Sequence, residues 1–422
     1  MVFTSRRRLL TAAGLGALGL AWPRRLRADG DAERKFLFVF CPGGWDVCSA
    51  FAPIFNDTTD HHAGDVAAEV GGFQITDGAA RPSVRGFFER WGSSTCLING
   101  VQIPSVAHDV CTRLTMTGVA NDGLDDWASI VAGTSTADRI LPNVHLSGPI
   151  YPHKHVGASV RVGMAGQLAR LVKGDALIRS DVSVPPVSFE RDALEEAWVR
   201  TRVDRWAATA GRGEPARLAL AEQLAGERAA RLQTQAEALE GAAIDLYNTI
   251  GYAVRSLAAG LARSGIVAYG QGANGLWDTH SGNGQQEGLF ETLFDALSRT
   301  LDDLASQPGE LAPTLLDETT VVVLSEMGRT PQLNAAEGKD HWTWTSALLI
   351  GAGVAGGRTV GAWTEGITGE PVDLASGEAH ASGVTLGPGH LGATLLRLAG
   401  LDPAEHLDPS LGTPIVGALE DG

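Results

Sequence analysis

The sequence predicts an α/β fold in which helices cover both faces of a largely parallel central sheet. Short, continuous apolar runs rich in β-branched residues recur along the chain and alternate with stretches of helical periodicity. Strands of this kind are buried on both faces, as in parallel sheets that lie between helices. A long stretch rich in Ala, Leu, Glu and Arg, at about 189–264, adds a helical insertion.

The first 28 residues predict a secretory signal of the twin-arginine type. The segment "SRRRLL" precedes the apolar run "TAAGLGALGLAW", which is too short to span a bilayer, and Ala28 supplies a small residue for cleavage. An ordinary signal or a short amphipathic anchor is the alternative. We expect one domain over residues 29–422 that is exported, to the periplasm or beyond the cell, with no integral membrane span.

The mature chain opens with a predicted buried strand, "KFLFVFC", which ends at "PGGWD". The next predicted elements are a short helix at "VRGFFERW", a strand at "STCLING" and a helix from about residue 107 through "RLTMTG". The stretch 189–264, interrupted at "GRGEP", predicts a helical hairpin that packs on the sheet. A coiled-coil surface for a partner is the alternative.

Strands and helices alternate again after residue 264. We expect strands at "GIVAYG", "TTVVVL" and "SALLIGAG" and helices at "LFETLFDALSRTLDDLA" and "LGATLLRLAGL". Strand–helix alternation of this kind is what a parallel sheet requires, because parallel neighbours need a crossover connection.

The charge of the chain argues against a nucleic-acid partner. The 33 basic and 49 acidic residues give a formal net charge of −16. Six arginines lie in the first 28 residues, so loss of this segment takes the net charge to −22. Nucleic acids and anionic membranes repel a protein this acidic.

The four cysteines leave two states open. Cys41, Cys48, Cys96 and Cys111 form an even set, which in an exported chain permits two disulfides, and a loop staple between Cys41 and Cys48 is one pairing. Free buried thiols are the alternative. Their spacing matches no zinc ribbon.

Acidic and imidazole side chains follow the predicted strands at the points where they end. In chain order these residues are Asp46, Asp278, His280, Glu326, Asp340 and His341. Ligands of such sheets bind beyond the carboxyl ends of the strands, and clustered carboxylates are costly to bury without a cation. These oxygen and nitrogen donors therefore predict a site for a divalent metal, Zn²⁺, Mg²⁺, Ca²⁺ or Mn²⁺.

Four segments of the chain resemble an exported bacterial family known only as a domain of unknown function, which itself resembles sulfatases and alkaline phosphatases in fold. The segments are "FLFVFCPGGWD", "DTHSGNGQQ", "VVVLSEMGRTPQLNAAEGKDHW" and "GVAGGRTVGAW". The resemblance implies an alkaline-phosphatase-like three-layer sandwich. It also implies that Asp278 and His280 hold one metal together with a late histidine, for which His341 stands.

The resemblance implies a weaker second metal position. Asp46 matches the carboxylate after the first strand, and Glu326 matches the acid of an Asp-His pair. Met327 stands where that pair has its histidine, and a thioether is a poor ligand for a hard metal. Only Asp46 and Glu326 would then remain, which implies an oxygen-rich Mg²⁺ or Ca²⁺ site, or one metal in place of two.

The resemblance further implies a nucleophile at a helix N-terminus. Counting back from Thr117-Gly118 reaches His108, with Ser105 and Cys111 nearby, and no Cys-x-Pro-x-Arg sulfatase motif is present. A phosphohistidine at His108 is one interpretation, and a ligand or a general acid/base is the more conservative one.

Two arginines are candidates for binding an anionic group. Arg329 and Arg113 each carry the guanidinium fork that pairs with phosphate or sulfate oxygens. A structural ion pair of Arg329 with Glu326 or Asp340 is the alternative.

These observations lead to two hypotheses. The first is an exported metal-dependent hydrolase of phosphate or sulfate esters, with His108 and Arg329 as catalytic residues and an anionic small-molecule or polymer ester as substrate. The second is a non-catalytic, metal-containing binding or assembly protein of the cell envelope, with an envelope protein as its partner.

Overall fold

The computed structural model describes residues 33–162, 245–270 and 275–420 without interruption. Between residues 163 and 244 it describes only parts, of which 189–209 is the longest. The predicted signal segment, residues 1–28, lies outside the described residues.

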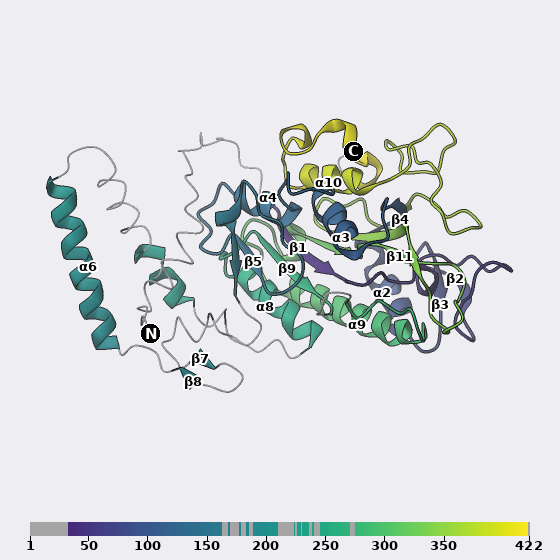
Figure 1. The fold of residues 1–422 in the computed structure, drawn as a ribbon, viewed down its shortest axis with the longest axis horizontal. Helices are drawn as coiled ribbons and strands as arrows, with labels where there is room; N and C mark the ends of the chain where they lie inside the picture. The colour runs from purple at the N-terminus through teal and green to yellow at the C-terminus, as the bar shows by residue number, and fades with distance from the viewer. Residues whose placement is uncertain are drawn as a thin grey trace.

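Among the described residues, the core of the fold is an eight-stranded sheet (Figure 1). Its strands, in order across the sheet, are β14 (Arg358–Val360), β4 (Thr95–Gln102), β13 (Trp344–Gly351), β10 (Thr319–Leu324), β1 (Lys35–Phe40), β9 (Ser264–Ala268), β5 (Asn143–His145) and β6 (Ser159–Arg161). Only β13 among these eight runs against the others, since it pairs antiparallel with both β10 and β4. The predicted α/β class with a largely parallel sheet is confirmed.

Helices cover both faces of the sheet. On one face lie α2 (Pro82–Trp91), α8 (Leu246–Ala258) and α9 (Gln285–Ser306), and on the other lie α3 (His108–Thr117), α4 (Trp127–Gly133) and α10 (Pro388–Leu398) (Figure 1). The central strand β1 serves both layers because side chains alternate along a strand. Phe36, Phe38 and Phe40 join one core, and the residues between them join the other.

The described parts of the helical stretch that the sequence predicts at 189–264 include two long helices, which lie in different parts of the fold. Helix α6 (Phe189–Thr209) lies at the far left of Figure 1, away from the sheet. Helix α8 packs against α9 and β9 and buries Leu246 and Ile250 in the core. The end of this stretch is therefore part of the layer that covers the sheet.

Smaller elements complete the described fold. They are the strand pairs β2 (Val66–Val70) with β3 (Phe73–Asp77), β7 (Leu177–Ile178) with β8 (Ser183–Val184) and β11 (Gly328–Arg329) with β12 (His341–Trp342), and the short 3-10 helices Val47–Ser49, Gly92–Ser94, Val156–Ala158, Leu316–Glu318, Pro403–Glu405, Pro409–Leu411 and Val416–Ala418. None of the helices in the described residues has the length and apolar character needed to cross a membrane.

All four cysteines lie in the described residues, and all four are buried free thiols. Burial raises the pKa of each of these thiols, to about 12 for Cys96 and about 11 for Cys111. They are therefore small apolar core groups in this structure, and the disulfide alternative is not realised.

Candidate metal centre

The predicted site residues converge at the carboxyl edge of the sheet. The loop after β9 carries Asp278 and His280, and the residues after β10 include Glu326. Helix α3 begins at His108, shortly after β4 ends. Because these parallel strands end at the same edge, their loops meet there.

A short antiparallel pair places two further residues beside them. In the pairing of β11 with β12, Arg329 lies opposite His341. The backbone of Thr330 also donates to the carbonyl of Asp340 (2.9 Å), so the loop returns to the sheet edge at a fixed register. The sequence "SEMGRTP" and the sequence "KDHW" are thereby brought together.

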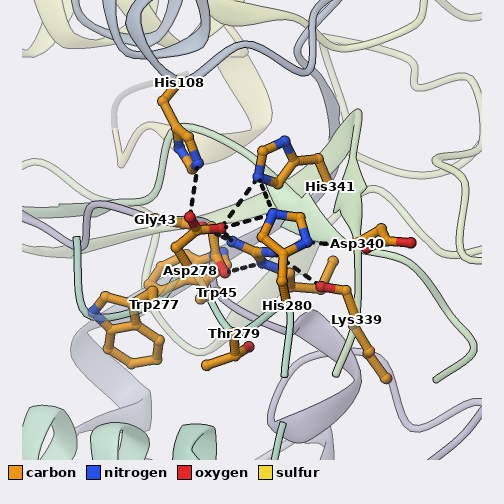
Figure 2. A network of polar contacts seen from close by, with 12 residues as sticks. Gly43, Trp45, His108, Trp277, Asp278, Thr279, His280, Lys339, Asp340 and His341 are labelled. Atoms are coloured by element: carbon orange, nitrogen blue, oxygen red, sulfur yellow. Dashed lines mark hydrogen bonds and ion pairs between the residues drawn. The ribbon is translucent and has the colours of Figure 1, made fainter. Parts of the chain in front are cut away.

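The carboxylate of Asp278 is the centre of the cluster (Figure 2). Its Oδ1 atom lies 3.1 Å from His280 Nε2 and 3.2 Å from His341 Nε2, and its Oδ2 atom lies 3.4 Å from His108 Nε2. The ligand atoms of His108, Asp278 and His341 all lie within 4.8 Å of one another, so these three residues form a group that could hold a metal ion.

Each of the three imidazoles has its Nδ1 atom against an acceptor. His108 Nδ1 lies 2.8 Å from Glu326 Oε1, and His280 Nδ1 lies 3.0 Å from Asp340 Oδ1. His341 Nδ1 lies 2.7 Å from the Val106 carbonyl oxygen. A carbonyl and a carboxylate only accept, so Nδ1–H is the donor in each ring.

In the neutral form that binds a metal, this tautomer leaves a lone pair on each Nε2 atom, because a neutral imidazole carries one N–H. Three such lone pairs then face the Asp278 carboxylate, and the Nε2 atoms of His280 and His341 are only 2.9 Å apart. His108 Nε2 is buried with no hydrogen-bond partner. Acceptors that face one another repel, and a cation between them removes the repulsion. The residues therefore fit a divalent metal.

The surroundings shift the pKa values of the cluster residues in different directions. The hydrogen bond from His108 to Glu326 raises the pKa of this histidine, whereas burial lowers the pKa of His341. Burial opposes the ionisation of Asp278, but the hydrogen bond from Arg329 and the charge of this guanidinium outweigh it and lower the pKa of the carboxyl. Asp278 is thus an anion in the folded protein near neutral pH.

The cluster is open to solvent on one side. His280 is 46% exposed and Asp340 is 59% exposed, whereas Asp278 is 11% exposed. The hydrogen bond to His280 lowers the pKa of Asp340. Asn334 supports this rim, since its amide donates to the His280 carbonyl (3.0 Å) and to Asp340 Oδ1 (3.1 Å).

Asp46 has a different environment from the one the sequence suggests. It is buried, and Lys339 Nζ lies 2.9 Å from its Oδ2 atom. The same carboxylate accepts from Asn283 (2.8 Å) and from the backbone of Cys48 (3.1 Å). The Lys339 ammonium group therefore offsets the charge of this carboxylate.

Protein groups surround the three buried residues Glu326, Met327 and Arg329. Glu326 accepts from the Gly43 backbone (2.7 Å) as well as from His108. Met327 is fully buried in the core that contains Phe36. Arg329 is fully buried and hydrogen-bonds to Asp278 (2.6 Å), so its ion-pair partner is Asp278 and not Glu326 or Asp340, the two partners that the sequence suggested.

Sequence reasoning missed four contributors to the site. Lys339 directly precedes the predicted site residue Asp340, so the sequence shows a positive charge near the site. The sequence does not show that the Lys339 side chain points to Asp46. The Val106 carbonyl and the Gly43 amide are backbone groups, which leave no side-chain signal. Asn334 was not singled out, because a loop asparagine usually caps a turn.

Comparison with known proteins gives one family and several distant structures. A family described as "Protein of unknown function (DUF1501)" matches residues 33–417. Similar solved structures include a Bacteroides thetaiotaomicron protein from its metabolism of multiple glycosaminoglycans (9% identity, 90% of this chain and 75% of that chain, TM-score 0.36). Another is a 2-O GAG sulfatase (12% identity, 92% of this chain and 76% of that chain, TM-score 0.33). No curated protein matches.

Proposed function

The chain belongs to this family of unknown function, and from the geometry of its site we propose that it is an exported metal-dependent hydrolase of phosphate or sulfate esters. The observation that carries the proposal is the convergence of three imidazole Nε2 atoms on the Asp278 carboxylate. Each ring is held in place by its own acceptor, as in metal sites where an outer partner fixes the tautomer and orientation of each ligand histidine.

The proposed ligands are His108, His280, His341 and Asp278. Three nitrogens and one oxygen suit Zn²⁺ or Mn²⁺ better than Mg²⁺ or Ca²⁺, which prefer oxygen donors. One metal per chain is proposed, because the Asp46 carboxylate is neutralised by Lys339.

When bound, the metal would supply Lewis acidity that stabilises negative charge on an ester oxygen in the transition state. Residues of the chain would orient the ligands and admit the substrate. Glu326 and Asp340 orient His108 and His280, and the exposed rim at His280 admits the ester. We assign no nucleophilic side chain, so water is the proposed attacking group.

One observation favours the second candidate, a metal-containing binding or assembly protein of the cell envelope. Arg329 was a candidate for holding the anionic group of an ester, but its guanidinium is fully buried and bonded to the protein. A phosphate or sulfate ester would therefore have to be bound without it.

The test is metal analysis followed by assay. The wild-type chain, purified without chelator, is expected to hold close to one equivalent of Zn²⁺ or Mn²⁺ and to hydrolyse an aryl phosphate, a phosphodiester or an aryl sulfate. The Asp278→Ala variant is expected to lose both properties. Metal binding without hydrolysis of any of the three esters would support the second candidate, and absence of metal binding would contradict both.

A further inference from the structure

We propose that Arg329 is a positioning residue of the metal centre, which fixes the ligand Asp278 by tying together the three loops that form the site. The proposal rests on the proposed metal centre, and it concerns how the protein builds that centre. Arg329 itself would touch neither metal nor substrate.

The burial of Arg329 and its hydrogen bonds define this role. Its side chain is 0% exposed, which is rare for an arginine unless every part of the guanidinium is paired. Nε donates to the Gly44 carbonyl (2.9 Å), and Nη1 donates to the Lys339 carbonyl (3.0 Å). Nη2 donates to the Gly43 carbonyl and to Asp278 Oδ1 (2.6 Å).

These acceptors come from three separate parts of the chain. Gly43 and Gly44 follow β1, Asp278 follows β9, and Lys339 precedes the late histidine. One rigid guanidinium therefore fixes the relative positions of three loops, and its planar fork makes the arrangement geometrically specific. The loop before α3, which precedes His108, contacts these three loops through the hydrogen bond from His341 Nδ1 to the Val106 carbonyl.

The β1 loop is shaped to receive this side chain. Gly43 and Gly44 have φ values of +119° and +87°, which favour glycine. A Cβ atom at Gly44 would lie 2.8 Å from Met327 Cγ and 3.3 Å from Arg329 Nε. The two glycines turn their carbonyl groups to the guanidinium, and the backbone approaches it too closely for a larger residue.

The consequence for the centre concerns both orientation and charge. Asp278 has a single charged partner that is wholly buried, so its carboxylate cannot rotate without breaking a charge-assisted hydrogen bond. The guanidinium also offsets the charge of that carboxylate, which leaves the ligand set less negative and a bound metal a stronger Lewis acid. Outer partners of this kind typically change metal affinity by about 10- to 100-fold.

The experiment titrates Co²⁺ into wild-type protein, Arg329→Lys and Arg329→Met, with Arg85→Met as a surface control. We expect the control to keep the wild-type dissociation constant and visible spectrum. We expect Arg329→Lys to fold, to bind about 10-fold more weakly and to show an altered Co²⁺ spectrum, because a lysine keeps the charge but cannot bond to all three loops. We expect a larger loss of affinity in Arg329→Met.

The outcomes separate this inference from the proposed function. If wild-type protein binds neither Co²⁺ nor Zn²⁺, the metal centre itself fails. If wild type binds and both Arg329 variants show its affinity and spectrum, the positioning role is overturned. Should the variants fail to fold, a crystal structure of the wild type with Zn²⁺ decides: a guanidinium beyond hydrogen-bond distance of Asp278 would overturn the role, and retention of the 2.6 Å contact would support it.

Discussion

The Nε2 atoms of His280 and His341 lie 2.9 Å apart, although the Nδ1–H of each ring is directed at an oxygen that only accepts. Neither Nε2 atom then has a hydrogen to offer the other. A close pair of acceptors that also faces the Asp278 carboxylate is repulsive unless a proton or a metal cation lies between the nitrogens. This relationship distinguishes the cluster from an ordinary group of surface histidines.

Substitution of either histidine is expected to weaken metal binding strongly. In His341→Ala and His280→Ala, one of four ligands is lost, and affinity for Zn²⁺, measured by calorimetric titration, should fall by at least about 10-fold. Zn²⁺ should also raise the melting temperature of the wild type, since a ligand at 100 times its dissociation constant contributes about 2.7 kcal/mol.

The control for this comparison is His153→Ala, in which an exposed loop histidine outside the cluster is removed. This variant should bind Zn²⁺ as the wild type does. Equal Zn²⁺ affinity in all three variants would show that the cluster is not the metal site.

We expect that removal of a carboxylate that accepts from a histidine Nδ1–H weakens metal binding more when the carboxylate is more deeply buried. Glu326 is 1% exposed and fixes His108, whereas Asp340 is 59% exposed. Glu326→Ala should therefore weaken metal binding more than Asp340→Ala, because solvent can replace the carboxylate only at the exposed position. Glu326→Gln keeps a neutral acceptor and should lie between Glu326→Ala and the wild type.

The measurement is again the Zn²⁺ dissociation constant, with the melting temperature of the metal-free protein as a check on the fold. A metal-free melting temperature that falls while the dissociation constant stays constant would assign Glu326 to stability alone. The same outcome would leave His108 outside the ligand set.

The fold was largely predictable because its strands are short, apolar and closed by turn residues. The runs at "KFLFVF" and "TTVVVL" coincide with β1 and β10. The reversed direction of β13 was not predicted, although a signal existed: the segment between β10 and β13 contains no helical pattern, and a parallel neighbour would need a crossover.

The sequence predicts which loops meet at the candidate site, but it does not predict which of their side chains face one another. Chain order placed Asp278, His280 and His341 at one edge because parallel strands end together. Whether Asp46 meets a metal or Lys339 depends on the direction of two loop side chains, and no periodic pattern encodes this. The hydrogen bonds from Arg329 to backbone carbonyls also depend on the direction of a loop side chain, so the sequence does not predict them.

The buried pair of Asp46 and Lys339 predicts a specific dependence of stability on pH. Burial opposes the ionisation of Asp46, but the charge and hydrogen bonds of Lys339 lower the pKa of this carboxyl below its ordinary value of 3.8. A group whose pKa is lower in the folded state stabilises the fold fully above its unfolded pKa, and this contribution is lost as the pH falls through the folded value. Unfolding of the wild type should therefore become easier below about pH 3.8.

The variant that tests this pair is Asp46→Asn. It should lose about 3 kcal/mol of the free energy of unfolding at pH 7, because Lys339 is left as a buried unpaired charge. Its stability should also fall less steeply than that of the wild type in the acid range. Denaturant unfolding at several pH values measures both effects, with Asp57→Asn, an exposed carboxylate, as the control. Parallel pH profiles for wild type and Asp46→Asn would refute the pairing.

The glycine at the centre of the β1 loop gives the last prediction. Gly44 has a φ of +87°, and an added Cβ would meet Met327 Cγ at 2.8 Å and the Gly328 carbonyl oxygen at 3.2 Å. Gly44→Ala should therefore cost about 2 kcal/mol or more, from backbone strain and from overpacking in the core. Because the Gly44 carbonyl accepts from Arg329, the Zn²⁺ affinity of this variant should fall as well.

Gly86→Ala is the matched control for this substitution. Gly86 lies in the interior of α2, is exposed, and has no atom within 4 Å of an added Cβ. Alanine there should raise the free energy of unfolding by about 0.5–1 kcal/mol, because it removes the conformational entropy that glycine loses in a helix. Opposite signs of the two effects, measured by denaturant unfolding, are the expected result. If Gly44→Ala were as stable as Gly86→Ala and bound Zn²⁺ as the wild type does, the close approach of the β1 loop to Met327 and Arg329 would be refuted.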